Sequence, residues 1–119
     1  MNGIAAYKAN TVATQSRVGL VVKLYEGAIR FLRLSLDELE AGRISEKAKL
    51  VNKAAAIVEE LNAALDMAGG GEIAANLRGL YTFMLKHLLT ANIHNDAAKI
   101  SEVIALLETL NEGWRVIAD

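Results

Sequence analysis

Hydrophobic residues recur at helical spacing along four stretches of the chain, and the first stretch carries more of them than one packing face needs. This stretch runs from Arg17 to about Ala41, and its main apolar stripe consists of Val18, Val21, Val22, Tyr25, Ala28, Ile29, Leu32, Leu36 and Leu39. A second apolar set falls roughly opposite: Leu20, Leu24, Phe31 and Leu34. A narrow polar band contains Lys23, Glu26, Arg30, Arg33 and Asp37. Because one stripe is enough to join a core, the second set must be covered by the rest of the chain or by a partner.

The second and third stretches predict two further amphipathic helices. Ser45 is the expected N-cap of the second helix, and three glycines at 69–71 end it. Its buried stripe is predicted to be Leu50, Val51, Ala54, Ile57, Val58, Leu61 and Leu65. The third helix runs from Glu72 to about Ile93, with a core stripe of Ile73, Leu77, Leu80, Met84, His87, Leu88 and Ala91. Tyr81, Leu85 and Leu89 are spaced four apart and extend this stripe onto a flank, so the third helix also has surplus apolar surface.

The fourth helix follows a cap at Asn95 or Asp96. Its stripe is Ile100, Val103, Ile104, Leu106, Leu107, Leu110, Trp114 and Ile117. Four helices of similar length with short connections predict an all-α, antiparallel up-down-up-down four-helix bundle over residues 16–119. Residues 1–15 are predicted to form a flexible N-terminal arm.

The arm contains few apolar side chains. Ile4 and Tyr7 are its only bulky apolar residues before Val12. Two interpretations stay open: a frayed terminus, or a detachable arm that places Ile4 and Tyr7 on an apolar groove of the bundle.

Composition supports a helical domain with an aliphatic core and narrows the possible partners. The chain has 119 residues, no proline, 53% hydrophobic residues and only 5% aromatic residues. A net charge of −1 offers no electrostatic reason to bind nucleic acid or an anionic membrane. Without a signal peptide pattern or an apolar run of membrane-spanning length, we expect a cytosolic protein.

The candidate catalytic chemistry is sparse. The chain has no cysteine, and neither histidine follows a glutamate by three residues, as a di-metal carboxylate bundle requires. His87 and His94 are seven residues apart, roughly 10 Å along a helix, which is too far to share a metal ion. A phosphotransfer histidine would face solvent, whereas His87 is predicted to point toward the core. We therefore predict a protein that is not an enzyme and needs no metal or cofactor.

Several segments resemble the flagellin-specific export chaperones, the FliS family. They are LYEGAIRFL at 24–32, NLRGLYTFMLKHLLTANIHND at 76–96, and Trp114 near the end. The resemblance covers nearly the whole chain, although this chain lacks the proline that often precedes the first helix in relatives. It implies a chaperone that holds the disordered C-terminal segment of flagellin, prevents premature polymerisation and presents it to the cytoplasmic domain of the flagellar export gate.

The surplus apolar flanks are the expected cargo site, because an amphipathic helix that docks in a groove needs such a surface. The expected flagellin-binding residues are Leu20, Leu24, Phe31, Leu34, Tyr81, Leu85, Leu89, Asn92 and Ile93. Ile4 and Tyr7 are expected to serve arm docking and recognition by the export gate. The alternative is a self-associating structural bundle without cargo, in which a second copy covers the extra face; a homodimer of the free protein is compatible with either interpretation.

Overall fold

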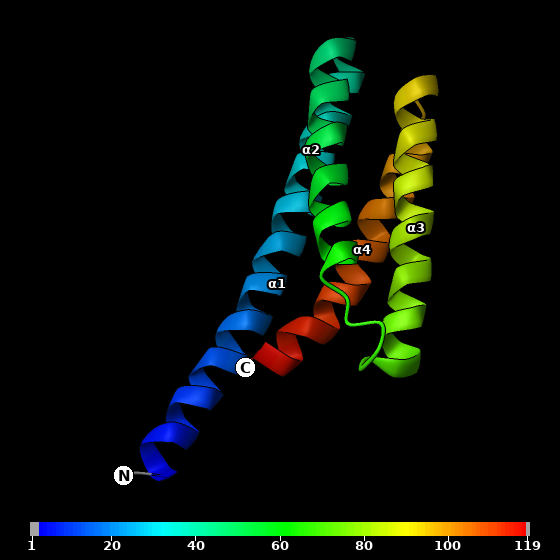
Figure 1. The fold of residues 1–119 in the computed structure, drawn as a ribbon. Coiled ribbons are helices and arrows are strands. Elements are labelled where there is room, and N and C mark those ends of the chain that lie inside the picture. Colours follow the sequence, from blue (N-terminus) through cyan, green and yellow to red (C-terminus); the bar gives the residue numbers. More distant parts are fainter. Residues whose placement is uncertain (1–2, 119) are drawn as a thin grey trace.

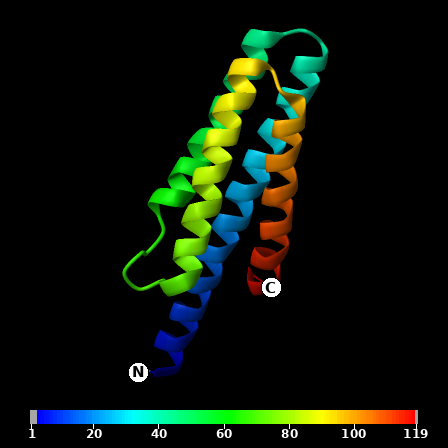
Figure 2. The same ribbon diagram turned by 90° about the vertical axis from the view of Figure 1, so that its right-hand side faces the viewer.

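A computed structural model of the chain describes the backbone of residues 3–118 and the side chains of residues 17–118. The four helices are α1 (Gly3–Glu40), α2 (Ile44–Ala63), α3 (Gly71–His94) and α4 (Ala97–Ala118). They alternate in direction along the bundle, as two perpendicular views show (Figures 1 and 2). The predicted all-α antiparallel four-helix bundle is therefore confirmed. The bounds of α1 include residues assigned to the arm, and the division into an arm and a bundle stays a prediction.

Each helix packs against two others: α1 and α3 both contact α2 and α4. The core takes about one residue per turn from the predicted stripe of each helix. Its members from those stripes are Tyr25, Ala28, Ile29, Leu32, Val51, Ala54, Val58, Leu61, Leu77, Met84, Leu88, Ala91, Ile100, Val103, Ile104 and Leu107. None of the helices in the described part of the chain combines the length and apolar character needed to cross a membrane.

The turns follow local backbone chemistry. After α1, Gly42 has φ +78°, and the amide of Arg43 donates to the carbonyl of Glu38 at 2.9 Å, which closes a Schellman motif. At the start of α4, Asp96 Oδ1 accepts a hydrogen bond from the amide of Lys99 at 3.2 Å, so Asp96 is the cap. The predicted cap at Ser45 is wrong: α2 begins at Ile44, and no side chain caps it.

Two residues of the predicted core stripes lie on the surface. Ile73 is 72% exposed and Ile117 is 62% exposed. Both line a shallow cavity of about 210 Å³ between the first turns of α3 and the last turns of α4. All the residues that line this cavity come from α3 and α4. Helical periodicity placed these residues beside core positions such as Leu77, but the neighbouring helices leave both side chains exposed.

Candidate functional site

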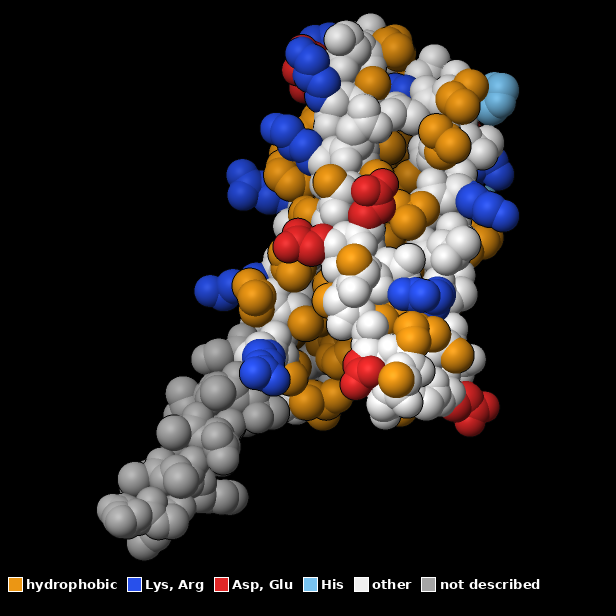
Figure 3. Space-filling view, in the orientation of Figure 1, with side chains coloured by type: hydrophobic (Ala, Val, Ile, Leu, Met, Phe, Trp, Pro, Cys, Tyr) orange, Lys and Arg blue, Asp and Glu red, His pale blue; other side chains and the backbone are white. Residues whose placement is uncertain are grey.

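An apolar groove lies between α2 and α3 and has a volume of about 320 Å³. It is lined by Val51, Asn52, Ala55 and Glu59 of α2 and by Leu85, Lys86, Leu88 and Leu89 of α3. We call it the α2/α3 groove. Hydrophobic side chains are visible along both sides of α2 in the space-filling view (Figure 3). The groove has an apolar floor with polar residues on both walls, which is the arrangement that an amphipathic helix can fill.

Two of the expected cargo residues of α3, Leu85 and Leu89, line this groove, and Ile93 lies one turn further along the helix. Leu85 packs partly against the core, whereas Leu89 is 63% exposed and Ile93 is 65% exposed. Their spacing of four residues keeps them on one side of the helix. Large apolar side chains this exposed on neighbouring turns form a surface that a partner could cover.

Tyr81 does not share this exposure, although the sequence predicted it on the same flank. Its side chain is only 2% exposed, and its hydroxyl lies 2.5 Å from the hydroxyl of Tyr25. The Tyr25 ring in turn packs against Trp114, with ring centroids 6.4 Å apart. Burial raises the pKa of both tyrosines, since the charged phenolate loses its hydration. The placement of Tyr81 on a surface flank is corrected: a buried polar pair holds it in the core.

Asn92 is partly exposed, but its side-chain amide is engaged within the bundle. Its Oδ1 and its backbone carbonyl each accept a hydrogen bond from Lys47 Nζ at 2.9 Å. Its Nδ2 donates to Asn52 Oδ1 at 3.2 Å and to the carbonyl of Ala48 at 3.4 Å. Lys47 is fully buried, and this burial lowers its pKa. Asn92 therefore links α3 to α2 instead of presenting a free amide to a ligand.

The four expected residues of α1 lie in different surroundings. Leu24 and Phe31 pack partly against the core, and the Lys53 ammonium of α2 lies 5.5 Å from the centre of the Phe31 ring. Leu20 is 59% exposed. Leu34, which is 40% exposed, instead lines a different groove on the side of α1 that faces α4. The structure therefore divides the second apolar set of α1 between two sides of the helix.

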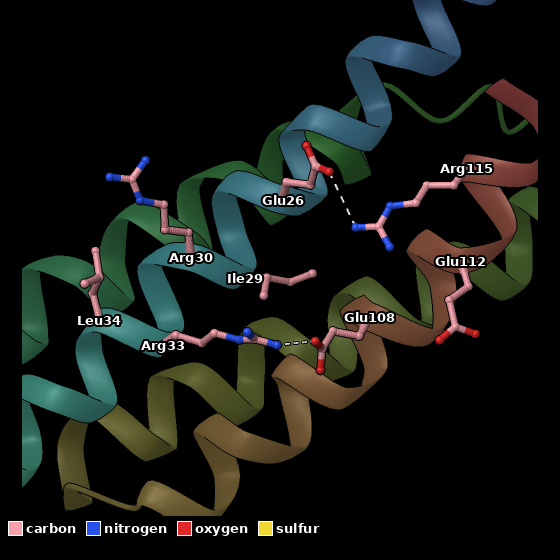
Figure 4. A pocket seen from close by; sticks show the side chains of 8 residues that line it. All are labelled: Glu26, Ile29, Arg30, Arg33, Leu34, Glu108, Glu112 and Arg115. Carbon is pink, nitrogen blue, oxygen red and sulfur yellow. Dashed lines mark hydrogen bonds and ion pairs between the residues drawn. The ribbon is translucent and has the colours of Figure 1, made fainter. Parts of the chain in front are cut away.

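That different groove, which we call the α1/α4 groove, is charged and was not anticipated from the sequence. It has a volume of about 440 Å³ and is lined by Glu26, Ile29, Arg30, Arg33, Leu34, Glu108, Glu112 and Arg115 (Figure 4). Arg33 pairs with Glu108, and Arg115 Nη2 lies 3.5 Å from Glu26 Oε2. The side chains in these pairs are about half exposed, so each pair contributes little to stability. The sequence does contain a signal that could have indicated this groove: charged residues spaced four and then three apart on each of the two helices.

The two histidines of the chain, His87 and His94, both lie on α3. His87 is mostly buried, stacks on Phe83 with ring centroids 4.5 Å apart, and is hydrogen-bonded to Glu102. Among the residues that the structure describes, no three His, Cys, Asp or Glu side chains lie close enough to hold a metal ion. The side chains of Ile4 and Tyr7 lie outside the described residues, so their expected docking role stays a prediction.

Comparison with known proteins decides the family. The profile described as "Flagellar protein FliS" matches residues 1–119. The chain belongs to the FliS family. It is 38% identical to the flagellar secretion chaperone FliS of Salmonella typhimurium, over 98% of this chain and 90% of that protein. It is 39% identical to FliSB of Pseudomonas aeruginosa over 80% and 75% of the two chains, and 31% identical to FliS of Bacillus subtilis over 96% and 84%.

The FliS fold is also found in a solved structure. A chain titled "Crystal structure of flagellar chaperone from bacteria" superposes with a TM-score of 0.81, covering 98% of this chain and 97% of that chain at 21% identity. This likeness supports the bundle architecture. The family assignment makes the protein a flagellar export chaperone, and the chaperone names of its relatives indicate a role without catalysis.

Proposed function

We propose that this FliS-family protein is a cytoplasmic chaperone for flagellin, and that it binds the disordered C-terminal segment of flagellin as helices in its apolar surface. The α2/α3 groove with exposed Leu89 and Ile93 beside it is the observation that carries the proposal. A segment that folds as it binds loses conformational entropy, so it needs a large apolar surface to compensate. Holding this segment would prevent flagellin from polymerising before export.

Within this proposal the cargo follows the α2 side of the bundle. Leu85, Leu89 and Ile93 provide its contacts on α3, while Leu20 provides an exposed contact on α1. Leu24 and Phe31 contribute their exposed edges, and Leu34 would contact cargo only where the cargo reaches the α1/α4 groove. Tyr81 and Asn92 act from within the bundle, by supporting the helices that carry these contacts. No cofactor is required, because the cargo is held and released by reversible packing alone.

The arm is proposed to link cargo binding to export. Ile4 and Tyr7 would cover part of the apolar groove in the free protein, and cargo would displace them. Exposed only on the loaded chaperone, they would allow the cytoplasmic domain of the export gate to distinguish loaded from empty protein.

Titration with a peptide of the flagellin C-terminal segment from the same organism tests the proposal. We expect saturable one-to-one binding and an increase in helical circular dichroism as the peptide orders. A peptide of the same composition in scrambled order is the control. Absence of binding by the native peptide, or equal binding of both peptides, would refute the flagellin-binding function.

Self-association is the second candidate, favoured by the exposed apolar side chains of Ile73, Val116 and Ile117 near one end of the bundle. Light scattering with and without flagellin separates the two. A stable dimer that ignores flagellin would indicate self-association, and a one-to-one complex would indicate the chaperone.

A further inference from the structure

Lys47 is a charged side chain in a fully buried position. Its relative exposure is 0%, and its Nζ lies 2.9 Å from both the carbonyl oxygen and the Oδ1 atom of Asn92. An ammonium removed from water is unfavourable unless strong acceptors replace the lost hydration. Asn92 is in the last turn of α3, where carbonyl groups lack helical partners and the helix dipole is negative. The α3 terminus therefore supplies hydrogen-bond acceptors for the buried Lys47 side chain.

The contacts continue from Lys47 to the α2/α3 groove. Asn92 Nδ2 donates to Oδ1 of Asn52, and Asn52 lines the groove. Within residues 17–118, five side-chain hydrogen bonds join α2 to α3, and four of them involve Asn92. The fifth, from Arg78 to the carbonyl of Asn62, lies at the opposite end of the two helices. Within residues 17–118, the side-chain hydrogen bonds that join the start of α2 to the end of α3 therefore all involve Asn92.

We propose that Lys47 is a positioning residue of the cargo site: through Asn92 and Asn52 it fixes the register of α2 against α3 at one end of the α2/α3 groove. The exposed side chains of Leu89 and Ile93 flank Asn92 on α3 and are presented to cargo in the position that this register sets. The inference rests on the proposed function, and it assigns to a buried residue a role in cargo binding that no surface contact would reveal.

A positioning role and a purely structural role of Lys47 predict different effects on cargo affinity, and two variants separate the two roles. Lys47→Met keeps the volume of the side chain but leaves the acceptors of Asn92 without their donor, so the thermal midpoint should fall. Lys47→Met combined with Asn92→Leu removes the pair formed by the two side chains, and removing both members of a buried polar pair costs less than removing one, although the backbone carbonyl of residue 92 still lacks its donor. The double variant should therefore recover part of the lost stability without restoring the link between the helices.

The test measures the thermal midpoint and the Kd of the flagellin C-terminal peptide for the full-length protein and each variant. We expect the affinity to fall at least tenfold for Lys47→Met and to stay low in the double variant although its midpoint partly recovers. Lys49→Met is the matched control, because Lys49 is on the same helix with its side chain 66% exposed, and it should bind like the wild type.

Two results would overturn the inference while leaving the proposed function intact: unchanged affinity in Lys47→Met, or recovery of both stability and affinity in the double variant. Failure of the wild type to bind the peptide would overturn the proposed function and the inference together. If Lys47→Met does not fold, Asn52→Ala changes only an exposed side chain. It should accelerate amide hydrogen exchange in the last turn of α3 of the free protein. Unchanged exchange would also overturn the inference.

Discussion

Leu88 and Leu89 are neighbours on α3 with opposite surroundings, and truncating each to alanine separates cargo binding from stability. Leu88 is 0% exposed, whereas Leu89 is 63% exposed. Complete burial of a leucine side chain is worth about 1.5–3 kcal/mol. At an exposed fraction of 63%, cargo can bury enough of Leu89 to contribute about 1–2 kcal/mol. Leu89→Ala should therefore raise the Kd of the flagellin peptide roughly five- to thirtyfold.

The effect on folding should show the reverse order. Leu88→Ala removes a fully buried side chain and should cost about 2–5 kcal/mol of unfolding free energy. Leu89→Ala should leave the unfolding free energy within about 0.5 kcal/mol of the wild type, as is usual for surface substitutions. Denaturant unfolding measures the stability of each variant, and isothermal titration with the peptide measures its affinity.

Val116→Ala is a matched control for the loss of an exposed apolar side chain, since Val116 of α4 is 77% exposed and lies outside the proposed cargo site. Val116→Ala should change neither the Kd of the peptide nor the unfolding free energy. The reasoning is wrong if Leu89→Ala binds as tightly as the wild type. It is also wrong if Leu89→Ala destabilises the protein as much as Leu88→Ala, because Leu89 would then belong to the core.

Two further predictions concern the buried tyrosines and the arm. Tyr25→Phe leaves the Tyr81 hydroxyl without its partner and should lower the unfolding free energy by about 1–3 kcal/mol, with the double phenylalanine variant closer to the wild type in denaturant unfolding. Because burial raises the pKa of both tyrosines, their phenol groups ionise first in the unfolded chain, near pH 10. The unfolding free energy should therefore fall as the pH rises above that value, and it should fall less in the double phenylalanine variant. Deletion of residues 1–10 should keep or tighten peptide binding, increase aggregation of the free protein and impair export. A substantial loss of affinity on deletion would instead make the arm part of the binding site.

Much of the bundle was predictable because it depends on local periodicity. A helix repeats every 3.6 residues, so the spacing of aliphatic side chains in each stretch identified the face that became the core. Gly42 and Asp96 ended and began helices as their backbone and side-chain chemistry predicts. The exposed residues Leu20, Leu89 and Ile93 were likewise found as apolar positions beyond the main stripes.

Tertiary structure decided which of these apolar positions remained exposed. Periodicity gives the direction of a side chain, but the neighbouring helix determines whether that direction is covered. Tyr81 was drawn into the core because Tyr25, 56 residues earlier, offers a partner for its hydroxyl. Ile73 and Ile117 remained exposed at the shallow cavity between the first turns of α3 and the last turns of α4.

Buried polar contacts were also beyond the reach of the sequence. Helical spacing puts Lys47 in register with the buried stripe of α2, four residues before Val51, but it does not show which groups accept hydrogen bonds from the Lys47 side chain. Only the packing of α3 against α2 brings Asn92, 45 residues away, to the Lys47 ammonium. The charged residues of α1 and α4 likewise form a groove only after the two helices lie side by side. Local sequence therefore determines the faces of the helices, whereas contacts between distant residues determine which surfaces remain free for a partner.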